Sequence, residues 1–280
     1  LEKKEGAGIL GTTDGFFADP SLVDTTLTTI ENFSRENIAS KNPKNHELFE
    51  VTPGKGVEVT LFDHTQNNVA HFYLGKTGPD FFSTYLRKEG ADEVILASGS
   101  IKSVFDKSVK NWRDKTIFDF PPATITQLII KTPSQEITLE KDDTGVWLMT
   151  TPEKGMVKKE EAEAIATTFA SLKAIDFAED EKLETYQLDT PEITINAILD
   201  AKEEKQLLVG KKHEEKSQYY VKTPAKKPVF LIGKYQVDTM NKTVQDLKEE
   251  EKKEEETKAE EENSESKNEA TVPVPNDSPS

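Results

Sequence analysis

The chain has 280 residues, with 36 basic and 52 acidic side chains and a net charge of −16. This charge disfavours nucleic-acid partners and anionic membrane surfaces, because both are bound through clustered Lys and Arg. The absence of cysteine excludes disulfides, thiolate metal sites and cysteine nucleophiles. No apolar run reaches the roughly 18 residues of a membrane helix, so we expect this chain itself not to span a bilayer.

The first part of the chain predicts a helix followed by short strands. Asp19 is a candidate helix cap with Pro20 at the first helical position, and the Thr-rich stretch 21–33 is expected to be helical. Apolar spacing then predicts an antiparallel meander and a second helix. The strands are expected at Phe49–Val51, Val57–Phe62, Ala70–Leu74, Ser83–Arg87 and Val94–Leu96, and the helix at Ile101–Trp112.

Adjacent prolines at 121 and 122 mark the expected boundary between two parts of the chain, because they cannot continue a helix. Beyond them the pattern predicts strands, an amphipathic helix, further strands and a closing helix. Trp147 is expected to be buried against the amphipathic helix. The strands are expected at Gln127–Ile130, Glu136–Glu140, Val146–Met149, Ile193–Leu199, Lys205–Val209, Gln218–Lys222 and Pro228–Ile232, and the helices over 158–172 and 234–247.

One pattern of the chain recurs about 135 positions later. Gly75 and Lys76 correspond to Gly210 and Lys211, Tyr85 corresponds to Tyr220, and apolar positions around them align without a gap. This recurrence predicts two copies of one structural unit. A glycine at the same place in both copies also indicates a backbone requirement, such as a positive φ.

The predicted fold class is therefore α+β, with two tandem copies of a unit of antiparallel β-hairpin and meander plus packed helices. The first unit is expected over residues 1–118 and the second over 119–248. Residues 249–280 are rich in Glu, Lys, Ser and Asn and contain no aromatic residue. We expect this acidic low-complexity segment to be disordered, because it cannot bury enough apolar surface to offset its conformational entropy.

No pattern in the sequence predicts catalysis, a cofactor or a metal. Gly75-Lys76-Thr77 resembles the end of a phosphate-binding loop, but the glycine that this motif requires five positions earlier is replaced by Ala70. The histidines show no metal-binding spacing, and the many acidic residues could supply a hydrolase pair only with suitable geometry. Trp112 and Arg113 are candidate ligand contacts. The alternative for Trp112 is a helix end whose ring packs into the core.

The second half of the chain resembles a bacterial family catalogued as domain of unknown function 4340. The resemblance rests on Gly145-Val146-Trp147, Thr151-Pro152, the stretch Tyr186-Gln187-Leu188-Asp189-Thr190-Pro191, Gly210-Lys211 and Tyr219-Tyr220-Val221. It covers roughly residues 125–248 well and the first half more weakly. The resemblance implies an extracytoplasmic protein with one N-terminal membrane helix, encoded beside parts of gliding-motility-type ABC transporters. That helix would lie in a segment absent from this chain.

The sequence and the resemblance together favour a non-enzymatic binding or scaffold protein. We expect it to be tethered to the membrane in its full-length form, outside the cytoplasm, with protein partners in an ABC-transporter-like complex. The alternative is a module that binds cell-envelope glycan in a cleft between the two units.

Overall fold

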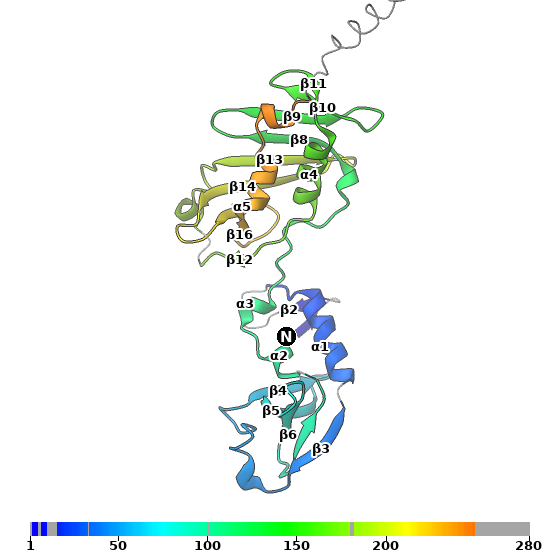
Figure 1. The fold of residues 1–280 in the computed structure, drawn as a ribbon, viewed down its shortest axis with the longest axis vertical. Helices are drawn as coiled ribbons and strands as arrows, with labels where there is room; N and C mark the ends of the chain where they lie inside the picture. The colour runs from blue at the N-terminus through cyan, green and yellow to red at the C-terminus, as the bar shows by residue number, and fades with distance from the viewer. Residues whose placement is uncertain are drawn as a thin grey trace, which may run out of the picture. The chain divides into compact units, whose positions relative to one another are not determined.

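The protein is mixed α+β, with two antiparallel sheets in two compact units that divide between Thr116 and Ile117 (Figure 1). The computed structural model describes residues 2–4, 7–9, 16–32, 34–99, 101–179 and 182–249. The expected acidic tail lies outside the described residues apart from Glu249. None of the helices in the described ranges combines the length and the apolar character that a bilayer crossing requires.

The first unit is built on a five-stranded antiparallel sheet with the order β3-β7-β6-β5-β4. A separate two-stranded hairpin, helix α1 and three shorter helical segments accompany this sheet. The elements are β1 (Glu2–Lys4), β2 (Ala7–Ile9), α1 (Pro20–Asn32), β3 (Arg35–Ser40), η1 (Pro43–Asn45), β4 (Val57–Phe62), β5 (Asn68–Thr77), β6 (Thr84–Lys88), β7 (Val94–Ala97), α2 (Ile101–Phe105) and α3 (Val109–Trp112).

Helix α1 begins at Pro20, as its capping residue predicts. One carboxylate oxygen of Asp19 accepts the backbone N–H groups of Ser21 and Leu22 at 2.9 and 3.2 Å. This cap satisfies N–H groups that have no partner inside the helix. The prediction of a helix over 21–33 is confirmed through Asn32, although Thr is a weak helix former. Phe33 lies outside the described residues.

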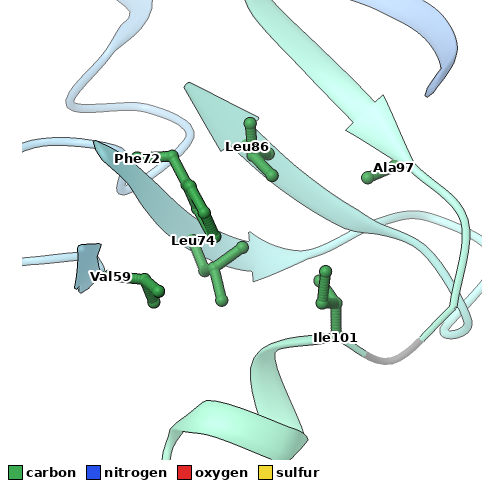
Figure 2. Packing of buried hydrophobic residues seen from close by; sticks show 6 residues of the cluster. All are labelled: Val59, Phe72, Leu74, Leu86, Ala97 and Ile101. Atoms are coloured by element: carbon green, nitrogen blue, oxygen red, sulfur yellow. The ribbon is translucent and has the colours of Figure 1, made fainter. Parts of the chain in front are cut away.

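The core of the first unit lies between the sheet and α2 (Figure 2). Leu74 and Ile101 are fully buried, so the start of α2 packs directly on the second strand of the meander. The Phe105 ring meets the Phe72 ring edge to face, with the centroids 6.4 Å apart. The buried residues of this cluster are Val59, Phe72, Leu74, Leu86, Ala97 and Ile101.

The second unit is built on a nine-stranded antiparallel sheet with the order β11-β10-β9-β8-β13-β14-β15-β16-β12. Helices α4 and α5 lie over one face of this sheet (Figure 1). The elements are η2 (Pro122–Thr124), β8 (Ile125–Lys131), β9 (Glu136–Lys141), β10 (Trp147–Thr151), β11 (Gly155–Met156), α4 (Lys159–Ala170), β12 (Asp176–Phe177), η3 (Leu183–Tyr186), β13 (Ile193–Leu199), β14 (Glu204–Lys212), β15 (Gln218–Lys222), β16 (Phe230–Gly233), α5 (Lys234–Met240) and α6 (Val244–Leu247).

The two sheets share one order of pairing. In the first unit the strands that follow α1 pair as β4-β5-β6-β7-β3, and in the second unit those that follow α4 pair as β13-β14-β15-β16-β12. The register agrees as well, because Val59 lies opposite Phe72 and Ile195 lies opposite Leu207. The sheets differ at one edge. Strand β8 pairs with β13, whereas among the described residues β4 pairs with β5 alone.

Several predicted elements differ from the structure. The strand expected at Phe49–Val51 is wrong, since this stretch is a turn in which Glu50 has a φ of 58°. The helix expected at Ile101–Trp112 is interrupted between α2 and α3. The helix expected over 234–247 is likewise interrupted, because Thr243 begins α6 as a cap that exchanges hydrogen bonds with Asp246. Strands β1, β2, β3, β11 and β12 were not predicted.

The units divide two residues before the predicted boundary, which follows residue 118. Ile117 and Phe118 already belong to the second unit, because their N–H groups donate to the carbonyl of Leu172 at 2.8 and 3.1 Å. The Phe118 ring also stacks on the Phe169 ring of α4, with a centroid separation of 4.6 Å. Contacts at the end of α4 therefore set the boundary, rather than the prolines that follow.

Trp147 is 4% exposed, so the prediction that it is buried is confirmed. We expect Trp147→Ala to lower the free energy of unfolding by about 3 kcal/mol, because it removes a large buried ring and leaves a cavity. Urea denaturation followed by circular dichroism measures this loss. Tyr235→Ala is the matched control, since Tyr235 is 80% exposed and its loss should change stability by less than about 0.5 kcal/mol. Equal effects of the two changes would contradict the burial argument.

Candidate functional site

In the first unit, a loop lies directly on the strand that carries Gly75. The loop closes with a hydrogen bond from the Val51 N–H to the His46 carbonyl at 3.0 Å. Its Phe49 carbonyl accepts the N–H of Lys76 at 3.1 Å, which joins the loop to β5. A Cβ on Gly75 would lie 2.0 Å from that same carbonyl oxygen. Only a residue without a side chain allows the loop and the strand to approach this closely.

The second unit has the same close approach at Gly210. The 3₁₀ turn η3 ends at Gln187, whose φ is 55°, and the Leu188 N–H closes on the Leu183 carbonyl at 2.9 Å. A Cβ on Gly210 would lie 2.1 Å from the Tyr186 carbonyl oxygen. In both units, therefore, a loop with one left-handed residue covers the glycine of the second meander strand.

The physical reason for the glycines differs from the prediction. Gly75 and Gly210 are absent from the glycines with positive φ in the described chain, so the expectation of a positive φ is wrong. The left-handed residues are instead Glu50 and Gln187, in the loops that cover the glycines. The repeated glycines provide space for a backbone carbonyl.

The other repeated positions form an aromatic contact beside each glycine. The Phe49 and Tyr85 rings lie 4.5 Å apart, and the Lys76 ammonium lies 5.6 and 6.0 Å from their centroids. In the second unit the corresponding rings, Tyr186 and Tyr220, stack at 4.1 Å. These contacts fix each loop on its sheet by aromatic packing. Lys211, which corresponds to Lys76, is half-buried.

Partial burial raises the pKa of the Tyr220 hydroxyl above its ordinary value. The His213 ring stacks on the Tyr220 ring with the centroids 5.7 Å apart, and its Nδ1 accepts the Glu215 N–H at 3.1 Å. These positions therefore serve packing and polar satisfaction of the loops.

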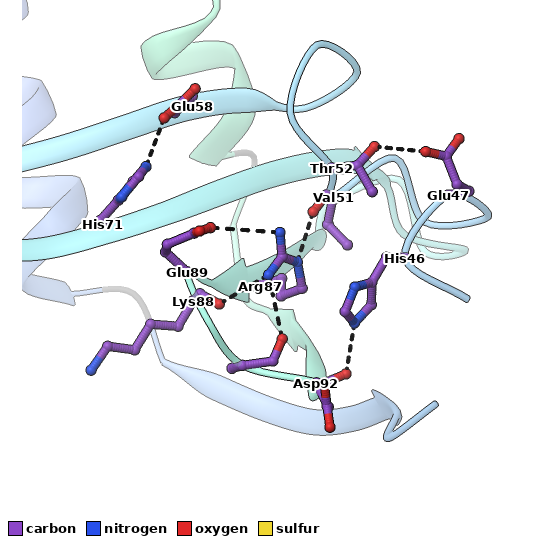
Figure 3. Close-up of polar contacts among 11 residues, drawn as sticks. His46, Glu47, Val51, Thr52, Glu58, His71, Arg87, Lys88, Glu89 and Asp92 are labelled. Atoms are coloured by element: carbon purple, nitrogen blue, oxygen red, sulfur yellow. Dashed lines mark hydrogen bonds and ion pairs between the residues drawn. The ribbon is translucent and has the colours of Figure 1, made fainter. Parts of the chain in front are cut away.

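A buried cation supports the loop in the first unit (Figure 3). Arg87 is 7% exposed, its Nε donates to the Val51 carbonyl at 2.8 Å, and its Nη1 donates to the carbonyls of Lys88 and Ala91 at 3.4 Å. Its guanidinium carbon lies 4.7 Å from the Tyr73 ring centroid. A buried charge requires such partners, because desolvation otherwise destabilises it.

Lys222 occupies the corresponding position in the second unit and binds the turn that follows it. Its ammonium donates to the carbonyls of Thr223 and Lys227 at 3.2 Å, and also to that of Lys226. Both cations therefore hold a turn through backbone carbonyls. These contacts order the turns that the two cations hold.

Trp112 and Arg113, the candidate ligand contacts, pack inside the first unit. Trp112 is 8% exposed and lies in a cluster with Ala18, Leu22 and Val23. Its carbonyl accepts the Asp19 N–H at 2.8 Å. The Arg113 guanidinium lies 3.9 Å from the centroid of the Phe16 ring. The structure thus places Trp112 in the core, the alternative that the sequence offered.

Two exposed aromatic rings at the β5–β6 turn were not predicted as site residues. Phe81 and Phe82 are 81% and 73% exposed. Asp80 holds the turn, because one of its carboxylate oxygens accepts the N–H groups of Phe82 and Ser83 at 3.1 and 2.8 Å and the Ser83 hydroxyl at 2.5 Å. We call residues 78–83 the aromatic turn. Its sequence signal was the Gly-Pro-Asp that precedes two adjacent phenylalanines.

The second unit contains a groove of about 500 Å³ between the β8–β9 turn and helices α5 and α6. Its lining includes Thr132, Ser134 and Thr243, which carry hydroxyl groups, together with Asn241, Tyr219 and the acidic residues Glu192 and Asp238. An aromatic ring beside hydroxyl and amide groups suits a neutral polar ligand, because such groups orient a ligand by hydrogen bonds.

Two histidines of the first unit make polar contacts. The His46 Nε2 lies 2.8 Å from the Asp92 carbonyl, and the His71 Nε2 lies 2.8 Å from a Glu58 carboxylate oxygen (Figure 3). Among the side chains that the structure describes, no three His, Cys, Asp or Glu residues converge closely enough to hold a metal ion.

A comparison with protein families matched this chain to the model described as "Domain of unknown function (DUF4340)". The matches cover residues 12–191 and 178–262. Their limits do not coincide with the two compact units, because the first match continues through α4 and ends ahead of β13. No curated protein and no solved structure matched the chain.

We expect Gly75→Ala and Gly210→Ala each to lower the free energy of unfolding by about 2–3 kcal/mol. The added methyl group cannot coexist with a carbonyl oxygen at 2.0 or 2.1 Å, so the loop or strand must shift. Gly155→Ala is the control, since a Cβ there meets nothing within 4 Å and should change stability by less than about 0.5 kcal/mol. Unchanged urea midpoints in both variants would show that the close approach is not required.

The pKa of Asp80 lies below its ordinary value, chiefly because the Ser83 hydroxyl and then the Ser83 N–H donate to the carboxylate. A lowered folded-state pKa means that the charged form stabilises the fold above the unfolded pKa and that this contribution disappears as pH falls through the folded pKa. Wild type should therefore have a higher urea midpoint than Asp80→Asn at about pH 6–7. This difference should vanish as the pH falls below the folded-state pKa of Asp80.

Trp112 fluorescence in a Trp147→Phe background reports on the first unit alone, because the chain has 2 tryptophans. A midpoint difference that stays constant down to strongly acidic pH would contradict the electrostatic role of Asp80. The same titration on Asp92→Asn, whose side chain lies outside this turn, controls for general effects of charge removal.

Proposed function

The chain belongs to the DUF4340 family, and from this premise we propose that it is a non-enzymatic binding or scaffold protein of an extracytoplasmic membrane complex. In this proposal the full-length protein is tethered to the membrane and acts beside an ABC-transporter-like assembly. The cellular side, the tether and the transporter partner follow the expectation that the family resemblance raised. The aromatic turn supplies the physical argument for binding.

The aromatic turn favours protein binding because it holds two apolar rings in water. Phe81 has a φ of 63°, and the Asp80 carboxylate fixes the backbone that follows it by accepting the N–H groups of Phe82 and Ser83. A Cβ on Gly78 would lie 2.0 Å from the Ser83 hydroxyl, so the turn is closed tightly. Rigid aromatic side chains lose little entropy on binding, and such residues dominate the binding energy of protein interfaces. The turn is therefore suited to insert into an apolar pocket of a partner.

We also propose that the two units are tandem copies of one ancestral unit. The shared order of pairing, the glycine close approach in each sheet and the left-handed residue in each covering loop support this proposal. The aromatic turn belongs to the first unit, and the corresponding β14–β15 connection of the second unit carries His213, Glu214 and Glu215 instead. On this proposal the copies share a scaffold and have diverged in what their turns present.

Binding of cell-envelope glycan is the second candidate function. The groove in the second unit favours it, because sugars are recognised by hydroxyl and amide groups beside an aromatic ring. Glu192 and Asp238 also line this groove, which makes it better suited to neutral sugars than to anionic ones. The groove lies within the second unit, at a different place from the cleft that the sequence suggested.

The proposal is tested by a pull-down of membrane proteins with a tagged full-length protein. We expect transporter subunits to be recovered with wild type, and Phe81→Ser with Phe82→Ser to reduce their recovery at least about tenfold, as for loss of a hot spot. Tyr235→Ser is the matched control, since it removes an equally exposed aromatic ring from the second unit. Failure to recover a transporter subunit, together with retention on envelope polysaccharide, would reverse the ranking of the two functions.

A further inference from the structure

The four edges of the two large sheets are protected to different degrees. The edges of the nine-stranded sheet, β11 and β12, have 2 residues each. In the five-stranded sheet, edge strand β3 carries two register shifts, which disturb a regular row of hydrogen-bonding groups. Edge strand β4 has 6 residues with the sequence Val-Glu-Val-Thr-Leu-Phe. Proteins usually prevent pairing at an edge strand with a lysine, a proline or a very short strand, and β4 has none of these features. Its one register shift comes at its end.

The second unit shows what covers the corresponding edge. Strand β13, which corresponds to β4, is paired along its length by β8. The correspondence is exact in register: Val59 matches Ile195, Thr60 matches Asn196 and Leu61 matches Ala197, through their partners on β5 and β14. In the second unit Ile130, Ile129 and Leu128 lie opposite these three positions. The chain therefore contains its own example of a strand that completes this edge.

The peptide groups at Thr60 are turned away from β5, toward the side on which no strand pairs with β4 among the residues that the structure describes. The Glu89 N–H donates to the His71 carbonyl at 2.9 Å, so the peptide groups of His71 face β6. Thr60 lies directly opposite His71 on the other side of β5. Opposite residues of an antiparallel pair either both face each other or both face away, so Thr60 directs its N–H and C=O away from β5. Glu58, two residues earlier, does the same.

We propose that the β4 edge binds an extended segment of a partner protein as an added antiparallel strand. The segment would carry apolar residues opposite Val59 and Leu61, which lie on the core side of the sheet. It would carry a basic residue opposite Glu58, because Lys131 lies opposite the corresponding Thr194 in the second unit and Glu58 is exposed and acidic. Main-chain hydrogen bonds would supply affinity and the alternating side chains specificity. The inference deepens the proposed binding function and rests on it for the identity of the partner.

The probe is a fluorescent peptide with the sequence of residues 124–132, Thr-Ile-Thr-Gln-Leu-Ile-Ile-Lys-Thr, added to the full chain. We expect saturable binding by fluorescence anisotropy. Thr60→Pro removes an outward N–H and leaves the β4–β5 hydrogen bonds in place, so it should weaken binding at least about tenfold. Thr60→Val keeps the N–H and should bind as wild type. A peptide with proline in place of Ile129 is the matching control on the probe.

A charge exchange keeps the proposal testable if Thr60→Pro fails to fold. Glu58→Lys should weaken binding of the probe, and a probe with Glu in place of Lys131 should restore it. Absence of saturable binding, or equal binding by wild type and Thr60→Pro, overturns the proposal. So does concentration-dependent dimerisation of the full chain that Thr60→Pro abolishes, since the edge would then belong to a second copy. Transporter subunits that are still recovered on Thr60→Pro would leave the proposed function standing without this edge.

Discussion

The contact on which both units depend is the approach of a loop carbonyl to a strand glycine. At Gly75 the carbonyl of Phe49 occupies the space that a side chain would fill, and at Gly210 the carbonyl of Tyr186 does so. Once the loop lies there, its aromatic residue reaches the neighbouring strand and packs on the ring of Tyr85 or Tyr220. The glycine is needed before the rings can pack, because ring packing cannot stabilise a loop that steric repulsion keeps off the sheet.

This contact also explains where the buried cation of the first unit lies. The loop brings the Val51 carbonyl to the Arg87 guanidinium, which would otherwise lack an acceptor at 2.8 Å for its Nε. In the second unit Lys222 takes the place of Arg87. Its compact ammonium donates hydrogen bonds to carbonyls of the turn that follows the strand, and not to the covering loop. The two units thus keep one backbone arrangement and differ in the side chains that satisfy it.

Local patterns predicted much of the fold. Strands Val57–Phe62, Ile193–Leu199 and Gln218–Lys222 agree with the structure at both ends, because short runs rich in β-branched, aliphatic or aromatic residues between turn residues define them locally. The stretch Phe49–Val51 has the composition of a strand but forms a turn, since Glu50 adopts a left-handed conformation in a loop that the Lys76 N–H joins to β5 through the Phe49 carbonyl. Strand β12 has 2 residues and exists through its pairing with β16, so no local pattern could predict it.

The candidate site was less predictable, because it too depends on contacts between residues far apart in the sequence. Recurrence of Gly75 and Gly210 pointed to the right positions, yet the reason for a glycine depends on a carbonyl distant in sequence. The aromatic turn had a local signal in Gly78, Pro79 and Asp80, but the exposure of Phe81 and Phe82 follows from the fold. The position of a strand at the edge of a sheet is harder still to predict from the sequence. Whether Val57–Phe62 lies at an edge depends on the order of all the strands.

That order gives the two units different capacities for association. In the second unit, hairpin β8–β9 and strand β10 extend the sheet past β13 until it ends at the two-residue strand β11, so its long strands are all paired. In the first unit the sheet ends at β4 among the described residues, with apolar side chains on the core side and turned-out peptide groups between them. If the two units are copies of one scaffold, as we propose, the second has its long strands paired within its own sheet, and the first keeps β4 for a partner. The aromatic turn lies in the first unit, where it joins the two strands next to β4 in the order of the sheet.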